Sequence, residues 1–299
     1  EEREAAVCAD ETTGETAAGQ GEQQEQFMML PEVPPSHHFA SSPAPSRAPR
    51  VIRREWKLLR QSLPPGVHCR GFEDRMDLLR VAVEGPDGSP YSGCIFFFDI
   101  HLPATYPDVP PSVHFHAHGE RLNPNLYDSG KVCLSLLGTW PGRGVEVWDP
   151  QHSNLLQVLV SIQGLVFNSD PYYNEAGYER QVGTPQGAAN SKLYNENALL
   201  LSLKTIATTL SRPPIPFGEL TRLHFAHHGP SILRSIHVIL DAATAVEGTA
   251  PSAELVAATK RWNIPCPPSS GFIHLFRKLA ERLEVTLQGA DATKTTEPS

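Results

Sequence analysis

A nine-residue apolar run, CIFFFDIHL at positions 94–102, constrains the fold of this chain more than any other feature. It is hydrophobic enough for a central strand of a sheet. Prolines follow it at once, at Pro103, Pro107, Pro110 and Pro111. Because proline fixes the backbone and cannot donate to a central ladder, this stretch must be a connection. The sequence therefore predicts a buried strand that ends at a rigid, proline-rich loop.

The segments before this strand predict a helix and a second strand. The helix ends at the Pro-Pro-Gly of positions 64–66, and its apolar face comprises Ile52, Trp56, Leu59 and Leu63. Apolar and polar residues then alternate over positions 79–84, as in a strand with one buried face. The Gly-Pro-Asp-Gly sequence at 85–88 is a turn. The order helix, strand, turn, strand predicts a mixed α/β domain.

A third strand is predicted after the proline-rich loop, and it carries a row of histidines. Val113, Phe115 and Ala117 alternate with three residues of the other face, His114, His116 and His118. A His-x-His-x-His strand could bind a metal from one face. No carboxylate or thiol is placed with it, so we expect solvent-facing or hydrogen-bonded histidines and no metal.

The sequence Asn123-Pro124-Asn125, followed eight residues later by Cys133, is the best candidate for a catalytic segment. A thiol is intrinsically nucleophilic and can take an acyl group from another thioester at little cost in free energy. An amine that attacks the new thioester builds negative charge on its carbonyl oxygen, which a fixed amide can stabilise. The alternative is that Cys133 is a buried thiol and Asn125 an ordinary turn residue.

These segments together resemble the ubiquitin-conjugating enzyme family over residues 50 to about 212. The matching pieces, in family order, are GPDGSPYSG, FFFDIHLPATYPDVPP, LNPN and GKVCLSLL. The resemblance implies an α/β (α+β) domain at 49–214, with an antiparallel four-stranded sheet and flanking helices. Asn123 replaces the family's usual histidine, 138–147 is an insertion, and the loop at 174–189 is longer than in small members. These departures resemble the very large members that combine conjugating and ligase activities.

The resemblance also implies roles for individual residues. Cys133 is expected to carry ubiquitin as a thioester, and Asn125 to stabilise the oxyanion during transfer to a substrate lysine. Alignment on Pro171 places Glu175 where the family has an acidic residue that lines the lysine's approach. The alternative for Glu175 is a solvated loop glutamate. No metal and no organic cofactor is implied, because ATP is used by the upstream activating enzyme.

The expected partners are ubiquitin, the ubiquitin-activating enzyme, protein substrate lysines and, as a further candidate, a ubiquitin ligase. Asp108 bears on the ligase, because many ligase-dependent relatives carry an apolar residue in this loop that contacts the RING domain. A charge there should weaken such docking, since burying it unpaired is costly.

Three other functions remain as alternatives. A non-catalytic ubiquitin-binding scaffold usually lacks the cysteine that this chain has. A papain-like protease would need a paired histidine and its own local motif, which the sequence does not supply. A conjugating enzyme for another ubiquitin-like modifier is the main rival, because modifier choice depends on surfaces that the sequence does not show.

Composition and charge describe the regions outside the catalytic domain. Residues 1–48 hold nine acidic residues against Arg3 and Arg47, so they carry −7 of the net charge of −8 and are predicted to be a disordered acidic tail. Residues 215–299 are predicted to form a helical C-terminal extension. Because the chain starts at Glu1, we expect a fragment or processed form of a longer protein.

The cysteines and the hydropathy of the chain indicate where in the cell the protein is expected. The five cysteines are odd in number and widely spaced, which argues against a disulfide framework and favours a reducing cytoplasmic or nuclear location. No run of eighteen apolar residues exists, so no membrane span is expected. The absence of a basic stripe with interleaved aromatics argues against nucleic-acid binding.

Overall fold

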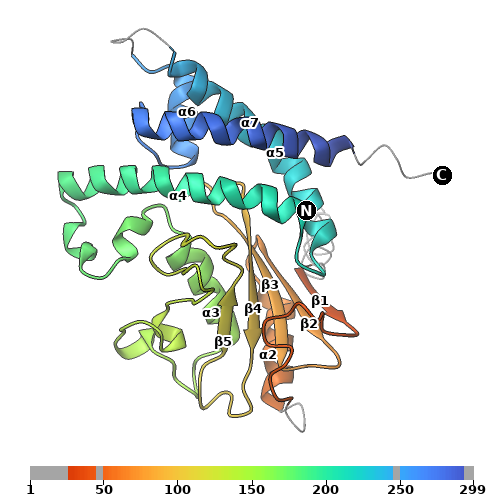
Figure 1. The fold of residues 1–299 in the computed structure, drawn as a ribbon. Helices are drawn as coiled ribbons and strands as arrows, with labels where there is room; N and C mark the ends of the chain where they lie inside the picture. Colours follow the sequence, from red (N-terminus) through yellow and green to blue (C-terminus); the bar gives the residue numbers. More distant parts are fainter. Residues whose placement is uncertain (1–25, 45–49, 245–249, 293–299) are drawn as a thin grey trace, which may run out of the picture.

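A computed structural model describes residues 26–44, 50–244 and 250–292, and it shows an α+β domain built on one sheet (Figure 1). The sheet has the order β1-β2-β3-β4-β5. Its strands are β1 (Phe27–Leu30), β2 (Val67–Phe72), β3 (Leu78–Glu84), β4 (Ile95–His101) and β5 (Ser112–Phe115). Strands β2 to β5 pair antiparallel in chain order, which confirms the predicted fold class and the central position of the 94–102 run.

The fifth strand corrects the prediction for the N-terminal region. Strand β1 pairs parallel to β2, with Phe27 opposite Cys69, although we predicted disorder for all of 1–48. Phe27 is 3% exposed, and its ring lies 6.4 Å from that of Trp56. The apolar FMML patch, residues 27–30, therefore covers the outer edge of β2. The acidic composition of the surrounding tail does not predict this pairing. Residues 1–25 and 45–49 lie outside the described residues, so the disorder predicted there stays a prediction.

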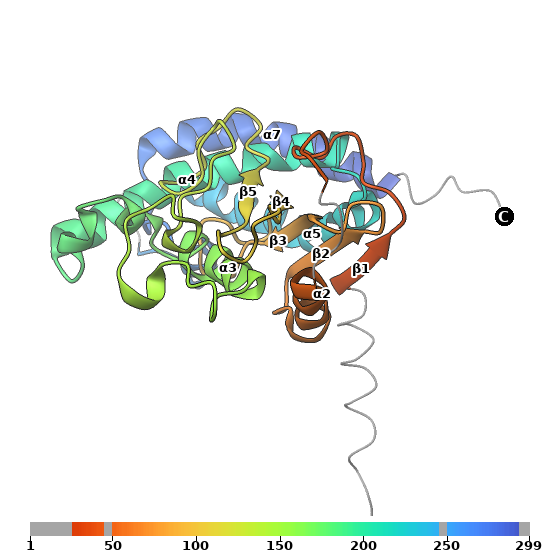
Figure 2. The ribbon, with the colours of Figure 1, turned by 90° about the horizontal axis from the view of Figure 1, so that it is seen from below.

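Helices cover both faces of the sheet (Figure 2). The helices within the predicted catalytic domain are α2 (Arg50–Ser62), α3 (Leu155–Ser161) and α4 (Pro185–Ser211). Helix α2 confirms the predicted helix and buries Ile52 and Leu59. Helix α3 starts at a capping box of Asn154 and Gln157 and continues as a π-turn, η3 (Ile162–Val166). Figure 2 shows α2 and α3 on one side of the sheet and α4 and α7 on the other.

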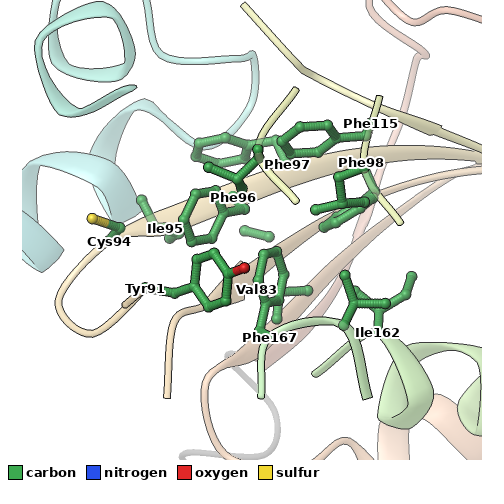
Figure 3. Close-up of a cluster of buried hydrophobic side chains, with 14 of the residues drawn as sticks. Val83, Tyr91, Cys94, Ile95, Phe96, Phe97, Phe98, Phe115, Ile162 and Phe167 are labelled. Carbon is green, nitrogen blue, oxygen red and sulfur yellow. The ribbon is translucent and has the colours of Figure 1, made fainter. Parts of the chain in front are cut away.

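One part of the core lies between the sheet and the α3–η3 segment. Figure 3 shows Phe96 and Phe98 of β4 gathered with Tyr91, Phe167 and Ile162. The rings of Phe96 and Phe167 stack at 4.6 Å. Strand β3 is buried on both sides from Leu78 to Val83, whereas its alternating sequence predicted one polar, exposed side. The difference arises because the C-terminal half of the chain covers the second face.

The C-terminal extension is helical, as predicted, but its divisions differ. Its helices are α5 (Gly218–Ala242), α6 (Ala253–Arg261) and α7 (Ser270–Ala292). The apolar spacings around Leu220 and around Ile236 each suggest a separate helix in the sequence, but both belong to the single helix α5, and α6 was not predicted. Helix α6 is followed by the fully buried Trp262, whose indole nitrogen donates to the Ser92 carbonyl at 3.1 Å. The extension therefore packs directly against the loop that precedes β4. The domain boundaries at 49 and 215 stay predictions.

None of the helices in the described part of the chain is long and apolar enough to cross a membrane.

Candidate active site

Asn123 organises the turn that precedes the candidate nucleophile. Its side-chain oxygen accepts hydrogen bonds from the backbone nitrogens of Asn125, at 2.8 Å, and Leu126, at 3.0 Å. Its amide nitrogen donates to the Tyr91 hydroxyl at 3.1 Å and to the Val166 carbonyl at 3.0 Å. Asn123 is 1% exposed, and all these contacts satisfy a buried amide. The residue that replaces the family's usual histidine thus fixes the turn to the core.

Two hydrogen bonds join Asn125 and Cys133. The Cys133 backbone nitrogen donates to the Asn125 carbonyl, and the Asn125 side-chain nitrogen donates to the Cys133 carbonyl, both at 2.8 Å. The structure therefore brings the two main predicted catalytic residues into contact. A primary amide nitrogen carries two hydrogens, so one can hold the loop while the second serves another acceptor. This leaves both roles considered for Asn125, oxyanion donor and loop former, compatible with the geometry.

Thr139 fixes the other side of Cys133, and sequence reasoning missed it. Its hydroxyl accepts from the Leu134 nitrogen at 2.9 Å and donates to the Val132 carbonyl at 2.7 Å. The two residues that flank the cysteine are therefore held by a single side chain. The only sequence signal was a hydroxyl residue at the start of the insertion after the cysteine.

Cys133 opens onto a cavity of about 530 Å³. The cysteine is itself only 2% exposed, so the cavity is its route to a reactant. Asn125 and Cys133 share this cavity with the 135–146 segment, which includes most of the insertion, and with the 173–179 loop. Trp140 and Val145 contribute apolar surface, and Glu146, Glu175 and Glu179 contribute carboxylates. The two segments that depart from the small-enzyme pattern thus build the walls of the site.

Glu175 lies in the same cavity, as the alignment on Pro171 predicted, and it has a partner there. The Arg121 guanidinium donates to its carboxylate at 3.2 Å and to the Pro124 carbonyl at 3.2 Å. Arg121 also lies over the Tyr127 ring, 4.4 Å from its centroid. The Glu175 side chain is 38% exposed, so solvent reaches the pair. Glu175 is therefore neither a free loop glutamate nor buried; its role in catalysis stays a prediction.

The tyrosines beside Glu175 divide into two environments. Tyr173 lines the cavity. Tyr172 instead packs its ring against Tyr178, at 4.7 Å, and Tyr194, at 6.1 Å. Burial raises the pKa of Tyr194 to about 12, so its phenol stays neutral at physiological pH. Tyr172 and Tyr194 thus support the loop from behind, while Tyr173 contacts the space in front of Cys133.

The histidine row at 114–118, which begins in β5, does not form a metal site with its neighbours in the described residues. His114 stacks on His38 with ring centroids 3.5 Å apart. His116 places its Nε2 atom 3.2 Å from the Asp99 carboxylate, and His118 is exposed. In the described ranges, the cluster of side chains that could hold a metal is instead Glu84, His224 and His228. The predicted absence of a cofactor stays a prediction.

Asp108 lies exposed in the proline-rich loop. The loop beside it is fixed by Trp148, whose indole nitrogen donates to the Pro107 carbonyl at 2.7 Å. Trp148 belongs to the Trp-x-Pro segment that follows the insertion, so this contact ties the far end of the insertion to the proline-rich loop.

Comparison with known proteins identifies relatives of this chain. The profile of the family described as ubiquitin-conjugating enzyme matches residues 51–200. The protein named Probable ubiquitin-conjugating enzyme E2 23, of Arabidopsis thaliana, is 53% identical over 210 residues, which cover 69% of this chain and 19% of that protein. Putative ubiquitin-conjugating enzyme E2 38, of the same plant, is 46% identical over 225 residues, covering 74% of this chain and 67% of that protein.

A human relative is a much longer protein. Dual E2 ubiquitin-conjugating enzyme/E3 ubiquitin-protein ligase BIRC6, of Homo sapiens, is 43% identical over 184 residues, which cover 59% of this chain and 4% of that protein. The chain thus spans about a fifth of the length of the first Arabidopsis relative and a small part of the human one.

Proposed function

Because the chain belongs to the ubiquitin-conjugating enzyme family, we propose that it accepts ubiquitin as a thioester on Cys133 and passes it to a lysine. The observation that carries this proposal is the pair of 2.8 Å hydrogen bonds between Asn125 and Cys133, on a cavity that Glu175 also lines. Nucleophile, amide donor and carboxylate thus share one space. Such an enzyme works in the cytoplasm or nucleus, where thiols stay reduced.

Loading of the enzyme is a thioester exchange. The Cys133 thiolate attacks the carbonyl carbon of ubiquitin's C-terminal thioester on the activating enzyme, and that enzyme's thiolate leaves. One C–S bond forms as another breaks, so the step needs no further energy source. ATP is consumed earlier, by the activating enzyme. The bonds from Asn125 and Thr139 hold Cys133 and its flanking residues in place for this exchange.

Discharge transfers ubiquitin from Cys133 to an amine. The lysine nitrogen attacks the thioester carbonyl, the C–N bond forms, and the Cys133 thiolate leaves. The negative charge that develops on the carbonyl oxygen is stabilised by the Asn125 amide. A lysine with a pKa near 10.4 is almost fully protonated at neutral pH, so its proton must pass to an acceptor such as Glu175 or water. To accept it, Glu175 exchanges its contact with Arg121 for one with the lysine.

The chain also performs discharge without a separate ligase. The name of the human relative assigns both conjugating and ligase activities to that protein. In this chain, the 138–147 insertion and the 173–179 loop wall the cavity that holds Cys133, so residues of the chain itself can align an incoming lysine. Asp108 adds an exposed charge where a RING domain would dock, which disfavours dependence on such a partner.

A charging assay tests the proposal. The chain is mixed with ubiquitin-activating enzyme, Mg-ATP and ubiquitin, and the product is resolved on a non-reducing gel. We expect a thiol-sensitive adduct that is absent from Cys133→Ala and replaced by a thiol-resistant ester in Cys133→Ser. Cys266→Ala is the matched control, because Cys266 is exposed and lies outside the cavity. An adduct that persists in Cys133→Ala contradicts the assignment.

The same assay separates the alternatives. Parallel reactions contain other ubiquitin-like modifiers with their own activating enzymes. Charging by one of these and not by ubiquitin would identify the rival conjugating function, and absence of charging by any modifier would indicate a scaffold. Addition of free lysine to the isolated charged enzyme then tests ligase-independent discharge, which we expect to proceed without a RING protein.

A further inference from the structure

A second cluster of chemically active side chains lies outside the Cys133 cavity. Glu84 stands at the end of β3, and His224 and His228 extend from α5. One ligand atom from each of the three side chains lies within 4.8 Å of those from the other two. His68 of β2 adds a fourth group, with its Nε2 atom 2.9 Å from a Glu84 oxygen. None of the four residues lines the cavity of Cys133, so the proposed ubiquitin transfer does not explain them.

The hydrogen bond of His224 determines which of its nitrogens is free. Its Nε2 atom lies 3.0 Å from the Gly93 carbonyl oxygen, which can only accept, so Nε2 carries the hydrogen. In the neutral ring, the lone pair is then on Nδ1, which lies 3.7 Å from a Glu84 oxygen. Metal-binding histidines commonly donate their second N–H to a backbone carbonyl in this way. His224 is 6% exposed, so packing holds the ring in this orientation.

His228 presents a second imidazole on the same face of α5. It follows His224 by four residues, the helical spacing that places two side chains side by side. Their ring centroids are 4.4 Å apart. The sequence H-x-x-x-H at 224–228 therefore forms a ready pair of nitrogen donors.

The carboxylate of Glu84 completes a donor set of two nitrogens and one oxygen. The His68 Nε2 atom lies 2.9 Å from one of its oxygens, and the His224 Nδ1 atom lies 3.7 Å from the other. Arg261 donates to the Ser231 hydroxyl and lies over the Trp262 ring. Glu84 and His68 also line an open cavity of about 830 Å³, through which an ion can reach the site from solvent.

We propose that Glu84, His224 and His228 bind a zinc ion that fastens helix α5 to the end of strand β3. Two imidazoles and one carboxylate, with water as the fourth ligand, are a ligand set that Zn²⁺ accepts. Bonds of about 2.1 Å would place the ligand atoms roughly 3.4 Å apart, which requires a small inward rotation of the side chains. His68 acts as a positioning residue, because its N–H holds one oxygen of the carboxylate.

Metal titration of the full chain tests this site. The protein is stripped with a chelator and titrated with Zn²⁺ against a chromophoric competitor. We expect one equivalent to bind with a Kd below about 1 μM. Loss of an outer partner of a metal ligand typically weakens binding about 10–100-fold, so His68→Ala should fall in that range and His228→Ala or Glu84→Gln beyond it. His227→Ala is the matched control, because this neighbouring histidine is exposed and lies outside the cluster.

Two further measurements keep the result interpretable. Zn²⁺ should raise the melting temperature of the parent and of His227→Ala but not that of His228→Ala, because binding to the folded state alone adds stability. The absorption spectrum of the Co²⁺ form should lack a thiolate-to-metal charge-transfer band. Failure of the parent to bind one equivalent, equal binding by His228→Ala, or a thiolate band from Cys133 or Cys266 would each overturn the proposal.

Discussion

Two arginine–carboxylate pairs in this protein have opposite environments. Arg80 and Asp99 lie on the neighbouring strands β3 and β4, and their side chains are 0% and 1% exposed. They form two contacts, Nε–Oδ1 at 2.5 Å and Nη2–Oδ2 at 2.9 Å. Arg121 and Glu175 lie at the rim of the Cys133 cavity, with side chains 45% and 38% exposed, and form one contact of 3.2 Å. The first pair is enclosed by protein, and the second is open to solvent and to a reactant.

The buried pair joins three parts of the chain. The backbone nitrogen of His38 donates to the Asp99 carboxylate at 2.7 Å, and the Arg80 guanidinium donates to the carbonyls of Ser36 and Ile215. It thus ties the N-terminal segment and the start of the C-terminal extension to the central strands. An enclosed pair cannot exchange partners without leaving a charge unpaired, whereas the open pair can exchange at little cost. The comparison indicates that Arg80–Asp99 serves folding and that Arg121–Glu175 is free to serve transfer.

The largest expected effect is on the buried pair. Arg80→Met removes the cation and leaves the Asp99 charge buried without its main partner, which typically costs about 3–5 kcal/mol. Urea unfolding followed by circular dichroism measures the loss. The double variant Arg80→Met/Asp99→Leu removes both charges and should recover part of the lost stability. If the double variant is less stable than the single one, the buried charge is not the cause.

The second effect distinguishes catalysis from stability at the active site. Asn125→Ala should still form the thioester, but we expect its discharge to lysine to slow by about 10²–10³-fold, the usual cost of losing one oxyanion donor. Single-turnover discharge of the purified charged enzyme measures this rate. Thr139→Val is a useful comparison, because Thr139 holds the same loop but lies outside the Cys133 cavity. Parallel losses of charging and melting temperature in Asn125→Ala would favour a role in shaping the loop.

The third effect is a pH dependence that belongs to the buried region. Burial lowers the pKa of His37, and burial and the neighbouring His38 lower the pKa of His114 to about 4. An unfolded histidine titrates near 6.5, so below that pH the unfolded chain binds the proton first and stability falls. We expect the melting temperature to drop as the pH goes from about 6.5 to 4. His114→Gln should flatten this decline, and an unchanged slope would exclude His114 as a contributor.

The Asp99 carboxylate, which pairs with Arg80, affects the stability of the fold at lower pH than the histidines do. Although burial favours its neutral form, His116 and Arg80 hold the pKa of Asp99 well below its usual range. Its contribution is therefore complete above the unfolded value near 3.9 and is lost only as the pH falls further. Stability lost between about 6.5 and 4 thus reports on the histidines and not on Asp99.

The smallest expected effect on stability comes from the exposed pair. Glu175→Gln should change the free energy of unfolding by less than about 0.5 kcal/mol, as is usual for surface substitutions. Charging should be unaffected. Discharge should slow about tenfold, less than the full contribution typical of a general base, because water can also accept the proton. The defect should be largest at low pH, where fewer lysines are unprotonated, and a pH profile that superimposes on the parent's would remove Glu175 from the site.

The sequence by itself determined the elements whose physics is local. The apolar run of β4 and the helical spacing in α2 predicted the sheet and its covering helix, because backbone preference and side-chain period act over a few residues. The Asn-Pro-Asn turn placed Asn125 beside Cys133, since a short connection confines both to one loop. Alignment on Pro171 selected Glu175, which lines the same cavity as Cys133, although its contact with Arg121 was not foreseen.

Only the tertiary structure decided the remaining features. Strand β1 was missed because its four apolar residues gain their burial from β2 and α2, not from their acidic surroundings in the chain. Arg80 lies on the side of β3 that was expected to be exposed, and it is buried because Ser36 and Ile215 cover it and Asp99 lies opposite it in the register. Glu84, His224 and His228 converge only when α5 packs across the sheet. A charged side chain's partner depends on which distant segment is packed against it, and short-range sequence rules carry no information about that choice.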